Sequence, residues 1–195
     1  MMKKIDFKCF SLVLIIILFN NCATTGYKKM SIEAPETLLS IQDSLLIERP
    51  SNQSIIDALV NAHINVAEKY INKGDNASAA EHFKSASELN SFNNVSKYGL
   101  LISEGRLLIS GGNKNGIWDA IEKFSKASTL YPGKGEPFYW IAISYTKLGD
   151  TDFDLILESY EKALALDLND KQRFEAEKKY EKAKERKKKL DTFWK

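Results

Sequence analysis

The chain has 195 residues, of which 44% are hydrophobic and 28% are charged, with 4 prolines and 10 glycines. This composition excludes a long disordered chain and suffices for one domain with a hydrophobic core. The formal net charge is +2, but residues 171–195 hold eleven basic and five acidic side chains, so a basic tail follows a mildly acidic body. Both cysteines lie within residues 1–22, which excludes a disulfide framework in the body.

The N-terminal residues have the pattern of an export signal. Residues 1–8 form a short basic segment, and residues 10–19 (FSLVLIIILF) form an uncharged apolar run. This run is too short to cross a bilayer as a helix, which needs about 20 residues. A basic segment followed by a short apolar core is typical of a secretory signal. Cys22 follows closely, in the sequence Leu18-Phe19-Asn20-Asn21-Cys22.

These residues resemble a bacterial lipoprotein signal over positions 1–21, although the three residues before the cysteine are larger than usual. The resemblance implies that Cys22 receives diacylglycerol and anchors the chain in the cell envelope, with a flexible tether at 22–35. Ala23, in place of Asp, implies the outer membrane, with the protein facing the periplasm. Each buried acyl methylene contributes about 0.8 kcal/mol, so several chains hold a protein stably. The alternative is a plain signal peptide with an incidental cysteine.

Residues 36–50 predict an N-terminal capping helix. Apolar residues recur there at helical spacing, at Leu38, Leu39, Ile41, Leu45 and Leu46. Pro50 ends this helix because proline disfavours helical backbone in the residue before it, and Ser51 is placed to cap the next helix.

Residues 51–170 contain one pattern three times, at about 60–93, 98–134 and 135–170. Each copy predicts a helix, a turn with glycine and a second helix. In the second helix an aromatic residue stands four positions after one small or apolar residue and three before an alanine. The three sets are Ala79/Phe83/Ala86, Ala120/Phe124/Ala127 and Ile156/Tyr160/Ala163. Gly74, Gly112 and Gly149 are expected to adopt the left-handed conformation that ends a first helix.

This pattern resembles the tetratricopeptide repeat (TPR). The resemblance implies an all-α fold, a right-handed α-solenoid of about three TPR helix pairs with N- and C-terminal capping helices. Independently of it, spacings of three and four place the small and aromatic residues on one helix face. Small residues there let helices approach closely. The first two copies are offset by 41 residues, from Phe83 to Phe124, against the family period of 34.

Residues 171–195 predict a basic C-terminal capping helix, with Ala176, Tyr180, Ala183 and Leu190 on one narrow face. Its cationic cluster is either a solvated helix face or a contact for anionic lipid or an acidic partner. The cluster comprises Lys184, Arg186, Lys187, Lys188 and Lys189.

Residues suited to catalysis are scarce. His63 occupies a position expected in the core, and His82, beside Phe83, is expected to face solvent; packing is favoured over metal binding for both. The run Gly111–Gly116 lacks the Gly-Lys-Ser/Thr ending of a phosphate loop and follows a predicted helix, so it predicts a turn. The sequence therefore predicts no enzyme, no metal, no cofactor and no nucleic-acid partner.

In the TPR family the first helices line a concave groove that binds a protein or peptide partner. Carried over by alignment, the groove residues are Asn61, Ile64, Glu68, Ile71 and Asn72, then Ile102, Arg106, Ile109 and Ser110, then Glu136, Tyr139, Ile143, Thr146 and Lys147. Exposed isoleucine and tyrosine with a polar rim would mark a binding site. The alternative is that the C-terminal helix folds into the groove.

The resemblances together imply a membrane-anchored TPR scaffold for protein–protein interactions in the bacterial cell envelope, in assembly of an outer-membrane or secretion machine. Its partners would be a protein or peptide in the groove and the membrane through lipidated Cys22. The alternative is a lipoprotein that binds a small ligand or assists transport, with the groove closed into a pocket.

Overall fold

The computed structural model describes residues 26–149 and 152–193, and the regular secondary structure of these residues is entirely helical. The all-α prediction is confirmed. A helical stretch at 26–33 precedes nine further helices in the described residues. They are α2 (Pro35–Ser40), α3 (Gln42–Glu48), α4 (Gln53–Lys73), α5 (Asn76–Leu89), α6 (Asn94–Gly111), α7 (Lys114–Leu130), α8 (Glu136–Leu148), α9 (Phe153–Ala165) and α10 (Asp170–Phe193).

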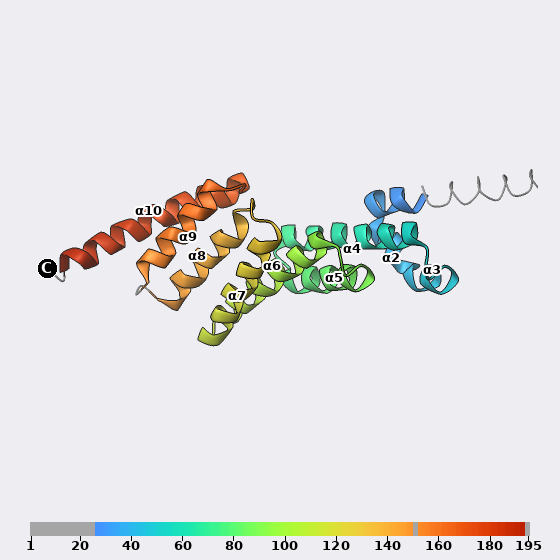
Figure 1. The fold of residues 1–195 in the computed structure, drawn as a ribbon, viewed down its shortest axis with the longest axis horizontal. Coiled ribbons are helices and arrows are strands. Elements are labelled where there is room, and N and C mark those ends of the chain that lie inside the picture. Colours follow the sequence, from blue (N-terminus) through green and yellow to red (C-terminus); the bar gives the residue numbers. More distant parts are fainter. Residues whose placement is uncertain (1–25, 150–151, 194–195) are drawn as a thin grey trace, which may run out of the picture.

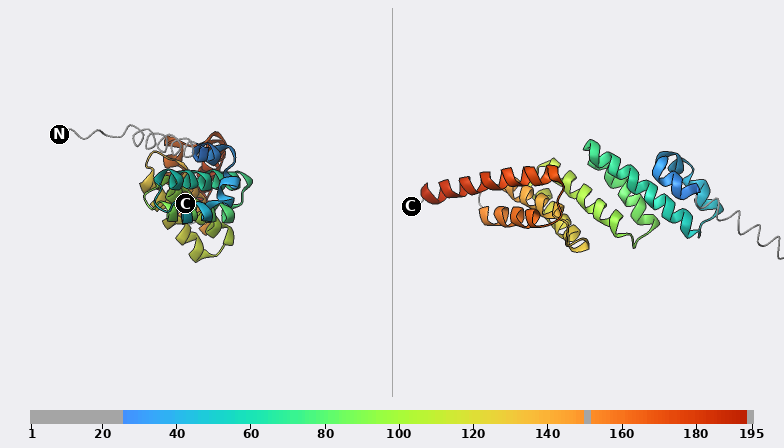
Figure 2. Two further views of the ribbon diagram at one scale, coloured as in Figure 1. Left: turned by 90° about the vertical axis from the view of Figure 1, so that its right-hand side faces the viewer. Right: turned by 90° about the horizontal axis from the view of Figure 1, so that it is seen from above.

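The helices follow one another along an extended row, from α2 and α3 at one end to the C-terminus of α10 at the other (Figure 1). The view from above shows the same row, whereas the end-on view gives a compact outline (Figure 2). From α4 onward each helix packs mainly against the next one in the chain, and α4, α6, α8 and α10 also contact one another in turn. Short connections between antiparallel neighbours produce this order.

Side-chain caps fix where five of the helices begin. An Asn or Asp oxygen accepts a hydrogen bond from the backbone N–H three residues later, which satisfies one otherwise unpaired donor of the first turn. The five caps are Asn52, Asp75, Asn93, Asn113 and Asn169, with N···O distances of 3.2, 3.0, 2.9, 2.7 and 2.9 Å. The prediction that Ser51 caps α4 is therefore wrong, since Asn52 holds that position.

Two of the three predicted glycine turns have the expected conformation. Gly74 and Gly112 end α4 and α6 in the left-handed region, with φ of 80° and 71°. Gly149 differs, because its φ of 130° and ψ of 175° lie in an extended region that is essentially limited to glycine. All three positions still require glycine, since side-chain-bearing residues rarely adopt such backbone angles.

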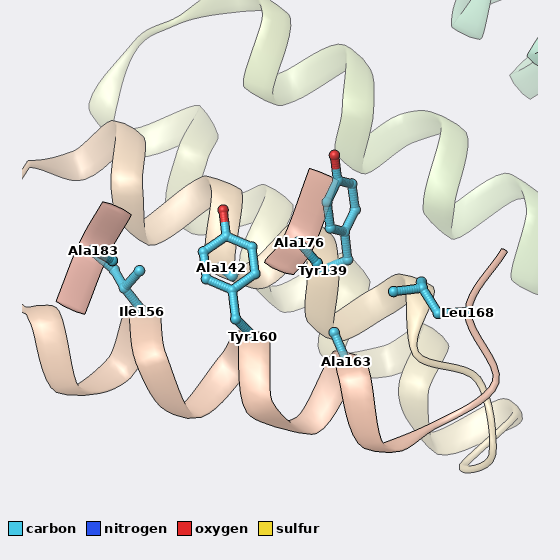
Figure 3. Close-up of a cluster of buried hydrophobic side chains, with 8 residues drawn as sticks. All are labelled: Tyr139, Ala142, Ile156, Tyr160, Ala163, Leu168, Ala176 and Ala183. Carbon is cyan, nitrogen blue, oxygen red and sulfur yellow. The ribbon is translucent and has the colours of Figure 1, made fainter. Parts of the chain in front are cut away.

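The aromatic and small residues of the second helices form the core of the row. Phe83, Phe124 and Tyr160 are each at most 4% exposed, and the small and apolar residues spaced around them are buried as well. Figure 3 shows the third set, in which Tyr160 and Ala163 of α9 lie beside Ala142 of α8 and Ala176 of α10. The predicted burial of this face is confirmed for each of the three second helices.

The N-terminal region differs from the prediction of a tether followed by one helix. Residues 26–33, expected to be flexible, are helical, and Ser31 is fully buried. The Asn65 side chain donates to the Ser31 carbonyl at 2.8 Å, so α4 holds this segment. The single capping helix expected over 36–50 is instead two short helices separated at Ile41, whose backbone has φ −111° and ψ 9°.

At the other end, α10 packs along α9 through Ala176 and Ala183, the only two of its described residues that are buried. Arg173 donates to the Leu164 and Leu166 carbonyls at 2.8 and 3.0 Å. These are unpaired acceptors at the C-terminal end of α9, so the guanidinium joins the two helices.

Candidate functional site

The predicted groove residues fall into two groups, one with buried side chains and one with side chains that solvent can reach. Ile64, Ile102, Ile109 and Tyr139 are buried, at most 8% exposed. The other residues predicted for the groove are exposed or half-buried, namely Asn61, Glu68, Ile71, Asn72, Arg106, Ser110, Glu136, Ile143, Thr146 and Lys147. Ile64 and Ile109 belong to hydrophobic clusters between helices, so they stabilise the stack and leave little surface for a partner.

Four of these residues, Glu68, Ile71, Ile102 and Glu136, lie around one hollow, here called the α4–α6 hollow. It has a volume of about 170 Å³, and Glu68 and Ile71 of α4 face Ile102 of α6 across it. Its remaining lining is Phe83, Val95, Tyr98 and Gly99. Val95, Gly99 and Ile102 follow helical spacing, so the period of α6 predicts an extension of the groove two turns toward the N-terminus of the helix. The alignment to the repeat began at Ile102, two turns too late to include Val95.

A second hollow, here called the α8–α10 hollow, has a volume of about 270 Å³. It contains the predicted residues Ile143, Thr146 and Lys147 of α8. Its other walls come from the neighbouring helices, with Phe153, Ile156 and Tyr160 on α9 and Lys179, Lys182, Ala183 and Arg186 on α10. Sequence reasoning missed the α9 and α10 residues because nothing local indicates that α10 lies across the end of α8.

Polar contacts around Glu136 form the wall of the α4–α6 hollow on its α8 side. The Glu136 carboxylate accepts hydrogen bonds from Tyr98 of α6 at 3.2 Å, from Trp140 of α8 at 3.3 Å and from Gln172 of α10 at 3.2 Å. Arg106 lies over the Trp140 ring, 4.9 Å from its centroid, which is a cation–π geometry. These contacts tie three alternate helices together, so the single predicted groove is divided.

Tyr139 is covered by α10. Its hydroxyl donates to Glu175 of α10 at 2.6 Å, and its side chain is only 2% exposed. Burial raises the pKa of Tyr139, and the Glu175 contact acts in the same direction. The C-terminal helix therefore covers this part of the α8 face, whereas both hollows remain beside it. Asn61, Asn72, Arg106 and Ile109 line neither of these two hollows.

A histidine pair joins the N-terminal helices, which the sequence did not indicate. His63 Nδ1 lies 3.0 Å from His82 Nδ1, and His63 Nε2 lies 2.9 Å from the Gln42 side-chain oxygen. His82 stacks on Tyr70 with ring centroids 5.6 Å apart. Burial lowers the pKa of His63 to about 4, and His82 adds to this effect. His82 is thus half-buried and paired, so the expectation that it faces solvent is wrong.

The remaining features considered from the sequence either lie outside the described residues or concern a metal site and a membrane span. Cys22 and the signal at 1–21 lie outside the described ranges. Within those ranges no group of three or more His, Cys, Asp or Glu side chains is arranged to hold a metal ion. Nor is any described helix both long and apolar enough to span a membrane. The sequence matches no protein-family model and no curated protein.

Proposed function

We propose that this chain is a right-handed TPR-type α-solenoid, in which α4/α5, α6/α7 and α8/α9 are the three helix pairs and α10 caps the array. The order of packing supports this arrangement, because each helix packs on the next and the first helices of successive pairs contact one another. The buried Phe83, Phe124 and Tyr160 occupy the aromatic position of the repeat in each second helix. A row of this kind presents an extended surface made by its first helices, which the Glu136 contacts divide in this chain.

The function we assign to this surface is the binding of a protein segment. The observation that carries the proposal is the α4–α6 hollow, which combines an apolar floor with carboxylates at its edge. Ile71 is half-buried and Val95 is 45% exposed, so apolar area is available there. Glu68 is exposed and forms no ion pair with any described residue. An apolar anchor next to a basic side chain would match this surface.

The cellular role follows from the N-terminal resemblance. We propose that diacylglycerol on Cys22 anchors the protein in the bacterial cell envelope, at the outer membrane, where the array acts as a scaffold for assembly of a larger machine. The proposal assigns no reaction to the chain. A small-ligand role remains the second candidate, and the α8–α10 hollow is the specific observation in its favour.

A charge introduced into the α4–α6 hollow tests the scaffold proposal. The full chain is crosslinked in membranes of its own cells and purified, and the affinity of the recovered protein partner is measured. Val95→Arg places a cation where we expect a basic partner to bind, so affinity should fall at least tenfold. Leu107→Arg is the matched control, because Leu107 lies on the same helix, is 37% exposed and does not line the hollow.

The scaffold proposal fails if no protein is recovered in stoichiometric amount. It also fails if Val95→Arg and Leu107→Arg change the affinity equally, because the partner would then bind elsewhere. Circular dichroism of both variants should show unchanged helix content, since both substituted side chains are exposed.

A further inference from the structure

The α8–α10 hollow combines apolar walls with a cationic rim. Its apolar lining is Ile143, Phe153, Ile156 and Ala183, and its basic lining is Lys147, Lys179, Lys182 and Arg186. No acidic side chain is among the described residues that line it. Arg186 already interacts with another residue, whereas the exposed Lys147 and Lys182 form no ion pair within the described part of the chain. The local charge is therefore positive and largely uncompensated.

A buried hydroxyl in the same hollow lacks a partner. Tyr160 is 1% exposed, and its Oη is buried without a hydrogen-bond partner among the described residues. The Tyr160 ring extends from α9 between Ala142 of α8 and the α10 alanines, with the hydroxyl at the end far from α9 (Figure 3). Thr146, the neighbouring polar residue of the lining, donates its own hydroxyl proton to the Ala142 carbonyl. Buried polar groups without hydrogen-bond partners are rare and cost stability. The Tyr160 hydroxyl is therefore expected to donate to an acceptor on a bound molecule.

Burial also raises the pKa of Tyr160 to about 12, although the nearby Thr146 side chain, which lies outside hydrogen-bond geometry with the Tyr160 hydroxyl, acts in the opposite direction. The hydroxyl is therefore protonated at neutral pH and available as a donor. A bound group that accepts this hydrogen bond would be an oxygen. If that oxygen belonged to an anion, the rim cations would stabilise it as well.

We propose that the α8–α10 hollow binds a small organic anion that consists of one carboxylate and one apolar body. The carboxylate accepts the Tyr160 hydroxyl proton in a hydrogen bond and is neutralised by Lys147 and Lys182. The apolar body packs against Ile143, Phe153 and Ile156. The volume of about 270 Å³ equals about nine waters at roughly 30 Å³ each, so the ligand has about ten non-hydrogen atoms.

Ligand binding in the α8–α10 hollow does not depend on the proposed protein partner. The Glu136 contact with Tyr98 forms part of the wall of the α4–α6 hollow, and neither residue lines the α8–α10 hollow. Glu136 and Ile143 are seven residues apart on α8, which places both hollows on the same helix face but two turns apart. Loss of binding in one hollow therefore leaves the other intact.

Phenylacetate is the probe, because it has one carboxylate, an aromatic body and about ten non-hydrogen atoms. It is titrated calorimetrically into the full chain in lipid nanodiscs, and the heat from empty nanodiscs is subtracted. A fragment of this size should bind with Kd of about 0.1–1 mM. 2-Phenylethanol and 2-phenylethylammonium have the same ring without the negative charge, and each should bind at least tenfold more weakly. Binding should also weaken as salt is raised.

Two variants assign the binding to this hollow. Tyr160→Phe removes only the hydroxyl and should raise Kd about five- to tenfold, whereas the Tm without ligand should not fall, because the hydroxyl has no partner to lose. Lys182→Glu reverses one exposed rim charge and should raise Kd more than tenfold. Lys178→Glu is its matched control on the same helix, since Lys178 is exposed and does not line the hollow, and should change Kd less than twofold.

Three results would each overturn the proposal. The first is the absence of saturable phenylacetate binding up to about 10 mM, well above the expected Kd. The second is equal affinity for the neutral or the cationic analogue, which would show that charge plays no part. The third is wild-type affinity in both Tyr160→Phe and Lys182→Glu, which would place any bound phenylacetate elsewhere on the molecule.

Discussion

His63 and His82 are the residues whose chemistry is most altered by the fold. Their Nδ1 atoms lie 3.0 Å apart, so one must donate and the other must accept, which requires at least one neutral ring. Burial lowers the pKa of both, and Glu81 and Glu36 partly oppose this for His82. Gln42 faces the other nitrogen of His63. The pair thus links α3, α4 and α5 only while at least one of the two rings is neutral.

We therefore expect the protein to lose stability in mild acid. His63 has a folded-state pKa of about 4 and an unfolded value of about 6.5, so the unfolded chain binds more protons below pH 6.5. The His63 contribution is fully present above that pH and is lost as pH falls toward 4. Between pH 6.5 and 5 the free energy of unfolding should fall by about 1.5 kcal/mol from this group.

Urea unfolding at pH 6.5 and 5 measures this loss, in a range that lies above the ordinary pKa of most carboxylates. A His63→Leu variant serves as the control, because it removes the titrating ring and should show a much flatter pH dependence. If the variant and the original chain lost equal free energy over this interval, the acid sensitivity would come from other groups.

At the scale of the helix, two glycines of α6 leave space for aromatic rings of the neighbouring helices. A Cβ on Gly99 would lie 2.4 Å from Phe83 Cε1 and Cζ, and a Cβ on Gly105 would lie 2.5 Å from Phe124 Cε1. Both rings belong to second helices, α5 before α6 and α7 after it. The glycines therefore allow α6 to pack closely on both neighbours, although each weakens the helix itself.

Gly105→Ala should consequently destabilise the fold despite the better helix propensity of alanine. Alanine gains up to about 1 kcal/mol in a helix, but displacing the fully buried Phe124 ring should cost about 1–3 kcal/mol. Gly111→Ala is the matched control on α6, because a Cβ there meets nothing within 4 Å. Thermal or urea unfolding should show a net loss for Gly105→Ala and a small gain for Gly111→Ala.

Equal gains in stability for the two variants would show that Phe124 moves aside without cost. That outcome would contradict the close packing of α6 on α7. The two substitutions are chemically identical, so any difference between them reports on the space around each site alone.

At the scale of the whole molecule, the row of helices separates the two ends of the chain. The described N-terminal residues lie at one end and α10 extends to the other (Figure 1). Figure 1 shows that α4 and α6, which line the α4–α6 hollow, lie nearer the N-terminal end of the row than α8, α9 and α10, which line the α8–α10 hollow. An anchor at Cys22 would therefore hold the array by one end and leave its binding surface accessible along its length.

The anchor has a direct test at this scale. Cells that express the full chain are fed a fatty-acid analogue, and labelling of the protein is measured together with its partition into membranes. Cys22→Ala should abolish both, because the thiol proposed to carry the diacylglycerol is gone, whereas Cys9→Ala should change neither. Equal labelling of Cys22→Ala and the original chain would exclude lipid attachment at this cysteine and leave a plain export signal.

The sequence alone determined the series of helices from α4 to α9 and the burial of Phe83, Phe124 and Tyr160, because both depend on a local period of 3.6 residues. It also indicated two left-handed glycine turns correctly. It could not show which first-helix residues stay accessible. Tyr139 is buried because Glu175, 36 residues later, lies against it, and Ile109 is buried between packed helices.

The tertiary structure decided the remaining features, which depend on contacts between distant elements. The His63–His82 pair joins residues 19 apart, and the Glu136 contacts join residues up to 38 apart. The Glu136 contacts divide the predicted groove into two hollows, and the packing of α10 on α9 places Lys182 and Tyr160 in one of them. Helical periodicity fixes which face of each helix is apolar, but only the stacking of the helices fixes what that face meets.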